Sequence, residues 1–64
     1  MSSFGEKITA LRKEKNLSNK EICKAVHIPQ SRLDELERDV RVPTAGQIAA
    51  LEAYYGLGEG ELTP

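Results

Sequence analysis

The 64-residue sequence contains a single cysteine, no tryptophan and only three aromatic residues. Cys23 has no partner for an internal disulfide, which favours a reducing compartment. No apolar run approaches the roughly 18 residues that a membrane span needs, and the first residues lack the basic start and apolar stretch of a signal peptide. We therefore expect a cytoplasmic protein with no membrane partner.

The shortage of aromatic residues also limits the core. The length allows one small domain over residues 1–64, with a core built from Leu, Ile, Val and Ala in which an enzyme cavity would be hard to form. Cys23 and His27 have the i, i+4 spacing of metal ligands, but no further Cys or His completes a site. Asp34 and Glu35 are adjacent carboxylates on a solvated helix, where they diverge. We expect no enzyme activity, no metal and no cofactor.

The charges are unevenly distributed although the formal net charge is only −1. Residues 1–24 carry six Lys or Arg against three acids, residues 25–43 sum to −1, and residues 44–64 carry three Glu with no Lys or Arg. The basic first part is therefore the part suited to meet an anion.

Helix-capping signals divide the chain into short helices. The pairs Ser3 with Glu6 and Ser18 with Glu21 are capping boxes, in which each side chain accepts a hydrogen bond from a backbone N–H of the other's turn. They predict one helix that ends at Asn16 and a second over about residues 19–26. The hydrophobic residues expected to be buried in these helices are Phe4, Ile8, Leu11, Ile22, Cys23 and Val26.

Two further helices and a final turn follow. Pro29 suits the first position of a third helix over about residues 29–38, with Leu33 and Leu36 facing the core. Thr44 with Gln47 begins a fourth helix, which buries Ile48, Leu51 and Tyr55 and stops at Gly56. Residues 57–62 predict one last helical turn, weakened by two glycines. The expected fold is therefore all-α, a compact bundle of four to five short helices.

Residues 18–39 form two short helices joined by a tight turn, the helix-turn-helix arrangement. The stretch LSNKEICKAVHIPQSRLDELER over residues 17–38, followed by Pro43 and Thr44, resembles the phage repressor and Cro type of helix-turn-helix, the xenobiotic-response-element-like family of bacterial and phage regulators. The resemblance extends from Phe4 to Leu62 and implies a lambda-repressor-like DNA-binding domain of five helices. It also implies a transcriptional regulator that binds a double-stranded DNA operator as a homodimer.

The resemblance assigns roles to individual residues. It implies base-edge contacts on the outward face of the third helix by Gln30, Ser31 and Glu35. It implies phosphate contacts by Asn19, Arg38 and Arg41, and the nearby Lys20 and Arg32 are further basic candidates. It also implies a partly buried ion pair between Arg12 and Glu37. Hydrogen-bonding chemistry supports the base contacts of Gln30 and Glu35, because glutamine pairs with adenine and glutamate accepts a hydrogen bond from cytosine.

The sequence departs from the family pattern in four respects. His27 stands where Gly is usual in a turn that prefers positive φ, and Asp39 replaces another common Gly. Pro29 replaces a Ser or Thr cap. Asp34 and Glu35 place two acids on the face expected to meet DNA.

The acidic third helix leaves a second function open. A module with the same fold, such as a repressor modulator or antirepressor, would bind another regulator protein through that helix and bind DNA weakly or not at all. A third reading is a purely structural piece of a longer protein. Three residues near the C-terminus are expected either to cap the core or to form a dimer surface: Tyr54, Leu57 and Leu62.

Overall fold

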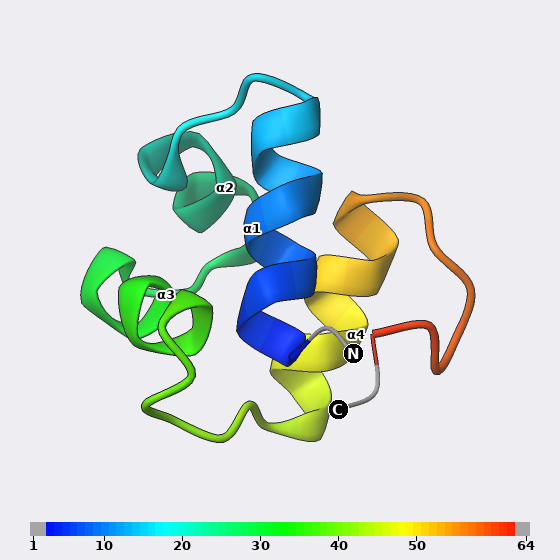
Figure 1. Cartoon of the computed structure of the whole chain (residues 1–64). Coiled ribbons are helices and arrows are strands. Elements are labelled where there is room, and N and C mark those ends of the chain that lie inside the picture. Colours follow the sequence, from blue (N-terminus) through cyan, green and yellow to red (C-terminus); the bar gives the residue numbers. More distant parts are fainter. Residues whose placement is uncertain (1–2, 63–64) are drawn as a thin grey trace.

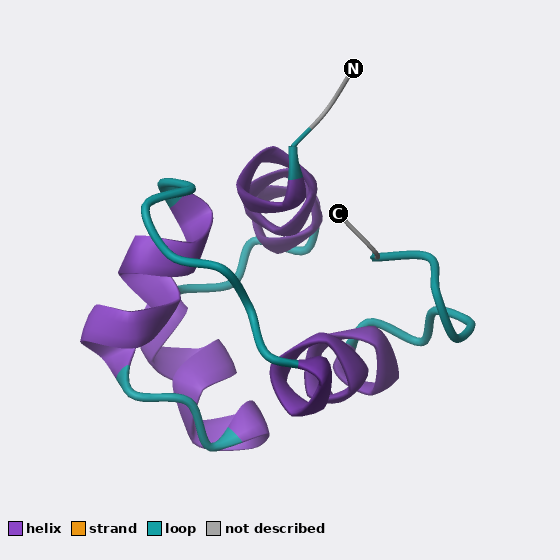
Figure 2. Ribbon diagram, turned by 90° about the horizontal axis from the view of Figure 1, so that it is seen from below, coloured by secondary structure: helices purple, strands orange, loops and turns teal. Residues whose placement is uncertain are grey.

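A computed structural model describes residues 3–62 of the chain, which form four helices and no strand over that range. The helices are α1 (Phe4–Glu14), α2 (Asn19–Val26), α3 (Gln30–Glu37) and α4 (Ala45–Tyr54). Helix α1 packs on α3, and α2 packs on both α3 and α4 (Figure 1). Seen along α1, the four helices surround a common centre (Figure 2). The predicted all-α bundle of four to five short helices is confirmed, with four helices in the described residues.

The predicted capping boxes begin three of the helices. Ser3, Ser18 and Thr44 each accept a hydrogen bond from the backbone N–H three residues later, and the side chain at that later position accepts from the cap's own N–H. These bonds satisfy N–H groups that a helix leaves without partners in its first turn. Because both partners lie within four residues, the local sequence is sufficient to place these helix starts.

The segment after α4 corrects the expectation of a last helical turn. Residues 57–62 form successive turns rather than a fifth helix, so the described chain has four helices. Gly56 and Gly60 have φ values of 70° and 88°, which break helical geometry on both sides of Leu57. The Leu62 N–H donates to the Glu52 carboxylate at 3.0 Å, which draws this segment back over the bundle.

The core lies where the four helices and the final segment converge. Its buried residues are Phe4, Ile8, Ile22, Ile28, Leu33, Leu36, Leu51, Tyr55 and Leu62. Four residues expected to be buried lie partly exposed at its edge: Leu11, Cys23, Val26 and Ile48. None of the helices in residues 3–62 is long and apolar enough to cross a membrane.

Candidate nucleic-acid interface

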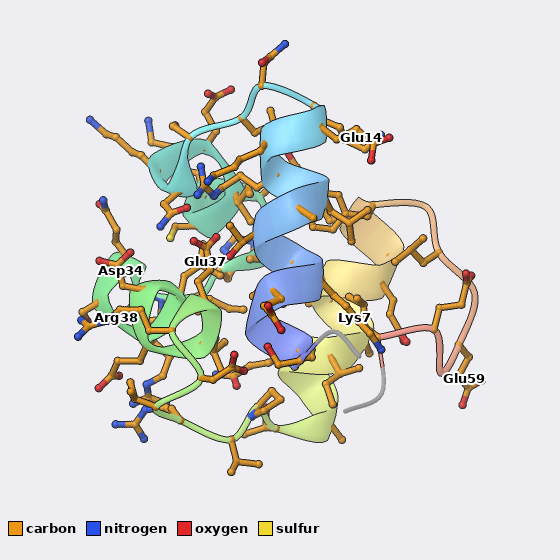
Figure 3. The ribbon with its side chains drawn as sticks, in the orientation of Figure 1. Lys7, Glu14, Asp34, Glu37, Arg38 and Glu59 are labelled. Atoms are coloured by element: carbon orange, nitrogen blue, oxygen red, sulfur yellow. The ribbon has the colours of Figure 1, made fainter. Side chains whose placement is uncertain are left out.

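Helix α3 is held in the bundle by one side and open to solvent on the other. Leu33 and Leu36 are 1% and 0% exposed, whereas Gln30 and Ser31 on the other side are exposed. Asp34 also projects away from the bundle (Figure 3). The apolar side therefore fixes α3 and leaves its polar face available to a ligand.

The turn between α2 and α3 is set by a residue with positive φ. His27 ends α2 with φ 58° and ψ 37°, the left-handed conformation, although it carries a full side chain. Ile28 follows and is buried. Pro29 then occupies the N-cap of α3 and gives no side-chain capping bond. The tight turn of a helix-turn-helix is thus formed here without the usual glycine.

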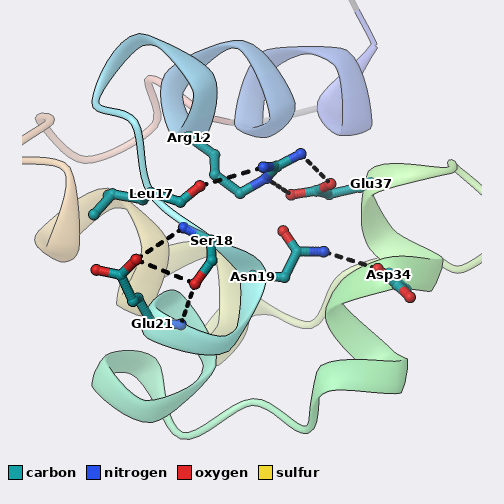
Figure 4. Close-up of polar contacts among 7 residues, drawn as sticks. All are labelled: Arg12, Leu17, Ser18, Asn19, Glu21, Asp34 and Glu37. Carbon is teal, nitrogen blue, oxygen red and sulfur yellow. Dashed lines mark hydrogen bonds and ion pairs between the residues drawn. The ribbon is translucent and has the colours of Figure 1, made fainter.

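A side-chain hydrogen bond joins the first turn of α2 to the exposed face of α3. Asn19 Nδ2 donates to Asp34 Oδ1 at 2.8 Å (Figure 4). Asn19 Oδ1 is buried and has no hydrogen-bond partner in the part of the chain that the structure describes. The amide of Asn19 therefore links the two helices, and Asp34 serves as its acceptor.

The second acid of α3 is paired with two arginines. Arg41 Nε lies 2.9 Å from Glu35 Oε1, and Arg32 Nε lies 3.6 Å from the same oxygen. The hydrogen bond from Arg41 lowers the pKa of Glu35 below its usual range, and the charges of both arginines add to that effect. The acids expected to repel DNA are therefore engaged within the protein, and one of them is neutralised by cations.

An ion pair ties α1 to the end of α3. Arg12 Nε and Nη2 donate to the two Glu37 oxygens at 2.9 and 3.3 Å, and Arg12 Nη1 donates to the Leu17 carbonyl at 3.3 Å. The two side chains are only 19% and 11% exposed. Figure 4 shows the guanidinium facing the carboxylate across the gap between the helices. This two-point contact fixes the C-terminal end of α3.

The four cations expected to contact phosphates lie on α2, on α3 or in the segment that follows α3. Lys20 is exposed in the first turn of α2, and Arg38 is exposed at the C-cap of α3, pointing away from α1 (Figure 3). Arg32 and Arg41 flank Glu35. The structure thus places the basic side chains of Arg32, Arg38 and Arg41 on α3 or in the segment that follows it, and that of Lys20 on α2.

Sequence reasoning missed the structural role of Asp39. Its backbone adopts φ 59° just after α3, and its carboxylate accepts hydrogen bonds from the Gly5 N–H at 2.9 Å and from the Ser3 hydroxyl. A carboxylate at a helix N-terminus is favourable because free N–H groups point toward it. No local sequence pattern predicts this contact, because Gly5 and Asp39 are 34 residues apart in the sequence.

The C-terminal residues divide between core and surface. Leu62 is 2% exposed and lies in the core, and Leu57 packs partly buried against it, while Tyr54 is 36% exposed. Leu62 is therefore not available for the dimer surface expected from the sequence. The hydrogen bond from its N–H to Glu52 holds it against the bundle. Glu52 is itself only 5% exposed, and no sequence pattern indicated a buried acid at this position.

Residues 3–62 contain no group of three or more His, Cys, Asp or Glu side chains that could hold a metal ion. Burial raises the pKa of the Cys23 thiol, and the charge of Asp34 adds to that effect. A raised pKa keeps the thiol protonated and less reactive.

Comparison with known proteins gives one finding. A family model described as helix-turn-helix matches residues 8–62, most of the chain. That family is a class of DNA-binding regulatory domain and not a class of enzyme. Comparison with curated proteins and with solved structures gives no significant match.

Proposed function

Since the chain belongs to the helix-turn-helix family of the phage repressor and Cro type, we propose that it is a cytoplasmic transcriptional regulator that binds a specific double-stranded DNA sequence. Helix α3 enters the major groove in this proposal. The observation that carries it is the two-sided character of α3, whose leucines are buried while Gln30 and Ser31 are exposed. An α-helix anchored in this way fits the width of the groove.

The base contacts are assigned to Gln30, Ser31 and Glu35. Gln pairs with adenine through N6 and N7, Ser bonds to several base edges, and Glu accepts from the cytosine amino group. The phosphate contacts are assigned to Asn19, Lys20, Arg32, Arg38 and Arg41. Asn19 stands at the start of α2, where its backbone N–H faces outward from the helix end. These phosphate contacts supply most of the affinity and make it depend on salt.

The proposed assembly on DNA is a two-fold homodimer. One short recognition helix offers too few base contacts for tight specific binding, and a dimer doubles them by binding two half-sites about one helical turn apart. Tyr54 and Leu57 are the exposed and partly exposed residues available for the dimer surface. Footprinting on a DNA duplex that contains the preferred sequence should show two protected half-sites. A single half-site bound at full affinity would contradict the dimer.

Selection of bound sequences from a random duplex library tests the function. The wild type should enrich one motif. Gln30→Ala should then cost about 1 to 3 kcal/mol on that motif and little on random DNA, because it removes one base contact. Glu14→Gln is a suitable control, since Glu14 is exposed at the far end of α1 from α3 (Figure 3). Absence of duplex binding even at low salt would rule out the regulator.

The protein-binding alternative rested on the two acids of α3. Asp34 accepts from Asn19, and Glu35 is paired with Arg41 and Arg32. The charge of Glu35 is therefore compensated by cations, whereas Asp34 accepts only from a neutral amide and keeps its negative charge, so the reason to prefer a protein partner is reduced to one acid. Co-elution with another regulator, together with no binding to duplex DNA, would restore that alternative.

A further inference from the structure

We infer that Arg41 is a specificity-determining residue, which positions the Glu35 carboxylate so that its second oxygen accepts a hydrogen bond from the amino group of a cytosine in the major groove. The inference rests on the proposed function and adds to it. It gives Arg41 a role in the choice of base, beyond the neutralisation of a phosphate.

The geometry around Glu35 separates its two oxygens. Arg41 approaches from the loop after α3 and Arg32 from the preceding turn of α3, and both contact Oε1. Within residues 3–62, no hydrogen bond is made to Oε2. A carboxylate oxygen that accepts a hydrogen bond from Arg41 and also lies 3.6 Å from the Arg32 Nε restricts the rotation of the carboxylate, and the other oxygen stays available as an acceptor.

The electrostatics explain why Glu35 needs this support. An unpaired carboxylate on α3 would approach two rows of phosphates, and the repulsion would oppose binding. The two adjacent guanidinium groups give the cluster a net charge of +1. The side chains are 38–42% exposed in the free protein, so water screens the contact there. Water would be displaced from it in the groove, where the same contact becomes stronger.

The groove chemistry selects the base. Only cytosine N4 and adenine N6 offer hydrogen-bond donors in the major groove. Adenine also presents the N7 acceptor beside its amino group, and a carboxylate has no donor with which to meet it. Cytosine is therefore the base that Glu35 fits, provided that Arg41 holds its charge and orientation.

The test compares selected motifs and salt dependence for the wild type, Arg41→Ala and Arg38→Ala. The wild type should enrich cytosine at one position of each half-site. Arg41→Ala should reduce that preference by about fivefold or more, while the preference at the position read by Gln30 is unchanged. Arg38→Ala is the matched control, since Arg38 is exposed and contacts no base in this scheme. It should weaken binding to all sequences equally and lower the salt slope by about one.

Glu35→Gln gives the second measurement. Because glutamine carries both a donor and an acceptor, the preferred base at the same position should change from cytosine to adenine. Uniform weakening by Arg41→Ala, with the motif intact and the salt slope lowered by about one, would show a simple phosphate contact and overturn the inference alone. If Glu35→Gln left the selected motif unchanged, the inference would be overturned together with the assignment of Glu35 as a base contact, while DNA binding through the other residues of α3 would stand. A wild type that enriches no motif would overturn the proposed function as well.

Discussion

At the scale of single residues, Tyr55 carries an unusual polar atom. The residue is 7% exposed at the C-cap of α4, and its hydroxyl is buried without a hydrogen-bond partner among residues 3–62. A buried hydroxyl that lacks a partner destabilises the folded state by its full desolvation cost. We therefore expect Tyr55→Phe to raise the free energy of unfolding at pH 7 by about 1 kcal/mol, as measured by urea denaturation.

The same hydroxyl predicts a loss of stability at high pH. Burial, with the nearby Tyr54 and Glu37, raises the pKa of Tyr55 to about 12, whereas an unfolded tyrosine titrates near pH 10. Between these values the folded chain keeps a proton that the unfolded chain releases, so the free energy of unfolding falls as pH rises from about 10 to 12. Tyr55→Phe should reduce this loss of unfolding free energy. Tyr54→Phe is the control, because Tyr54 is more exposed than Tyr55. An equal fall in both variants would exclude Tyr55 as its source.

At the scale of elements, the contact between α1 and α3 depends on a glycine. A Cβ at Gly5 would lie 2.4 Å from the Glu37 carbonyl oxygen and 2.7 Å from that of Leu36. These are backbone atoms, so the helices would have to separate to admit a methyl group. We expect Gly5→Ala to lower the melting temperature and to cost about 1 to 3 kcal/mol.

Gly46 in α4 provides the matched control. A Cβ there meets nothing closer than Thr44 Oγ1 at 4.0 Å. Gly46→Ala should therefore stabilise the protein by up to about 1 kcal/mol, because alanine is the better helix former. Equal effects of the two substitutions on the melting temperature would mean that Gly5 is not a close contact.

The helices could be predicted from the sequence where their signals are local. The boxes at Ser3, Ser18 and Thr44 connect residues three apart, and each begins a helix at the expected place. The positive φ at His27 and Asp39 also follows from their places in the family pattern, because both stand where glycine is usual. Local sequence failed at residues 57–62, where helical turns were expected and irregular turns are found.

The sequence was sufficient to predict which residues of α3 are exposed, but not which side chains form hydrogen bonds and ion pairs there. Gln30 and Ser31 lie exposed on α3 as its leucine spacing requires. The pairing of Asp34 with Asn19 and of Glu35 with Arg41 depends on side-chain directions that only the packed structure defines. Two contacts depend on the tertiary structure: the Asp39 carboxylate accepts from the Gly5 N–H at the start of α1, and the buried Glu52 carboxylate accepts from the Leu62 N–H. Hydrophobic periodicity indicates neither contact.

At the scale of the whole molecule, the ion pair between Arg12 and Glu37 joins the first helix to the end of the third. A domain of 64 residues has a small core and a correspondingly small margin of stability. Arg12→Met would leave the 11% exposed Glu37 carboxylate without its partner, and we expect a loss of about 3 kcal/mol or more. The loss would be seen as a lower urea midpoint.

The neighbouring substitution Lys13→Met is the control for that loss. Lys13 is exposed on α1, so its replacement should change stability by no more than about 0.5 kcal/mol. An urea midpoint for Arg12→Met within error of that for Lys13→Met would show that the ion pair adds little to stability.

The hydrogen bond between Asn19 and Asp34 has a consequence for evolution and for redesign. Exchange of the residues on α3 is the obvious route to a new binding preference, and positions 30 and 31 are open to it because their side chains are exposed. Position 34 is not independent, since a residue there without an acceptor leaves the Asn19 amide unbonded at the start of α2. Positions 19 and 34 should therefore change together among descendants of this sequence, and a graft of α3 should be accompanied by the matching residue at position 19 of α2.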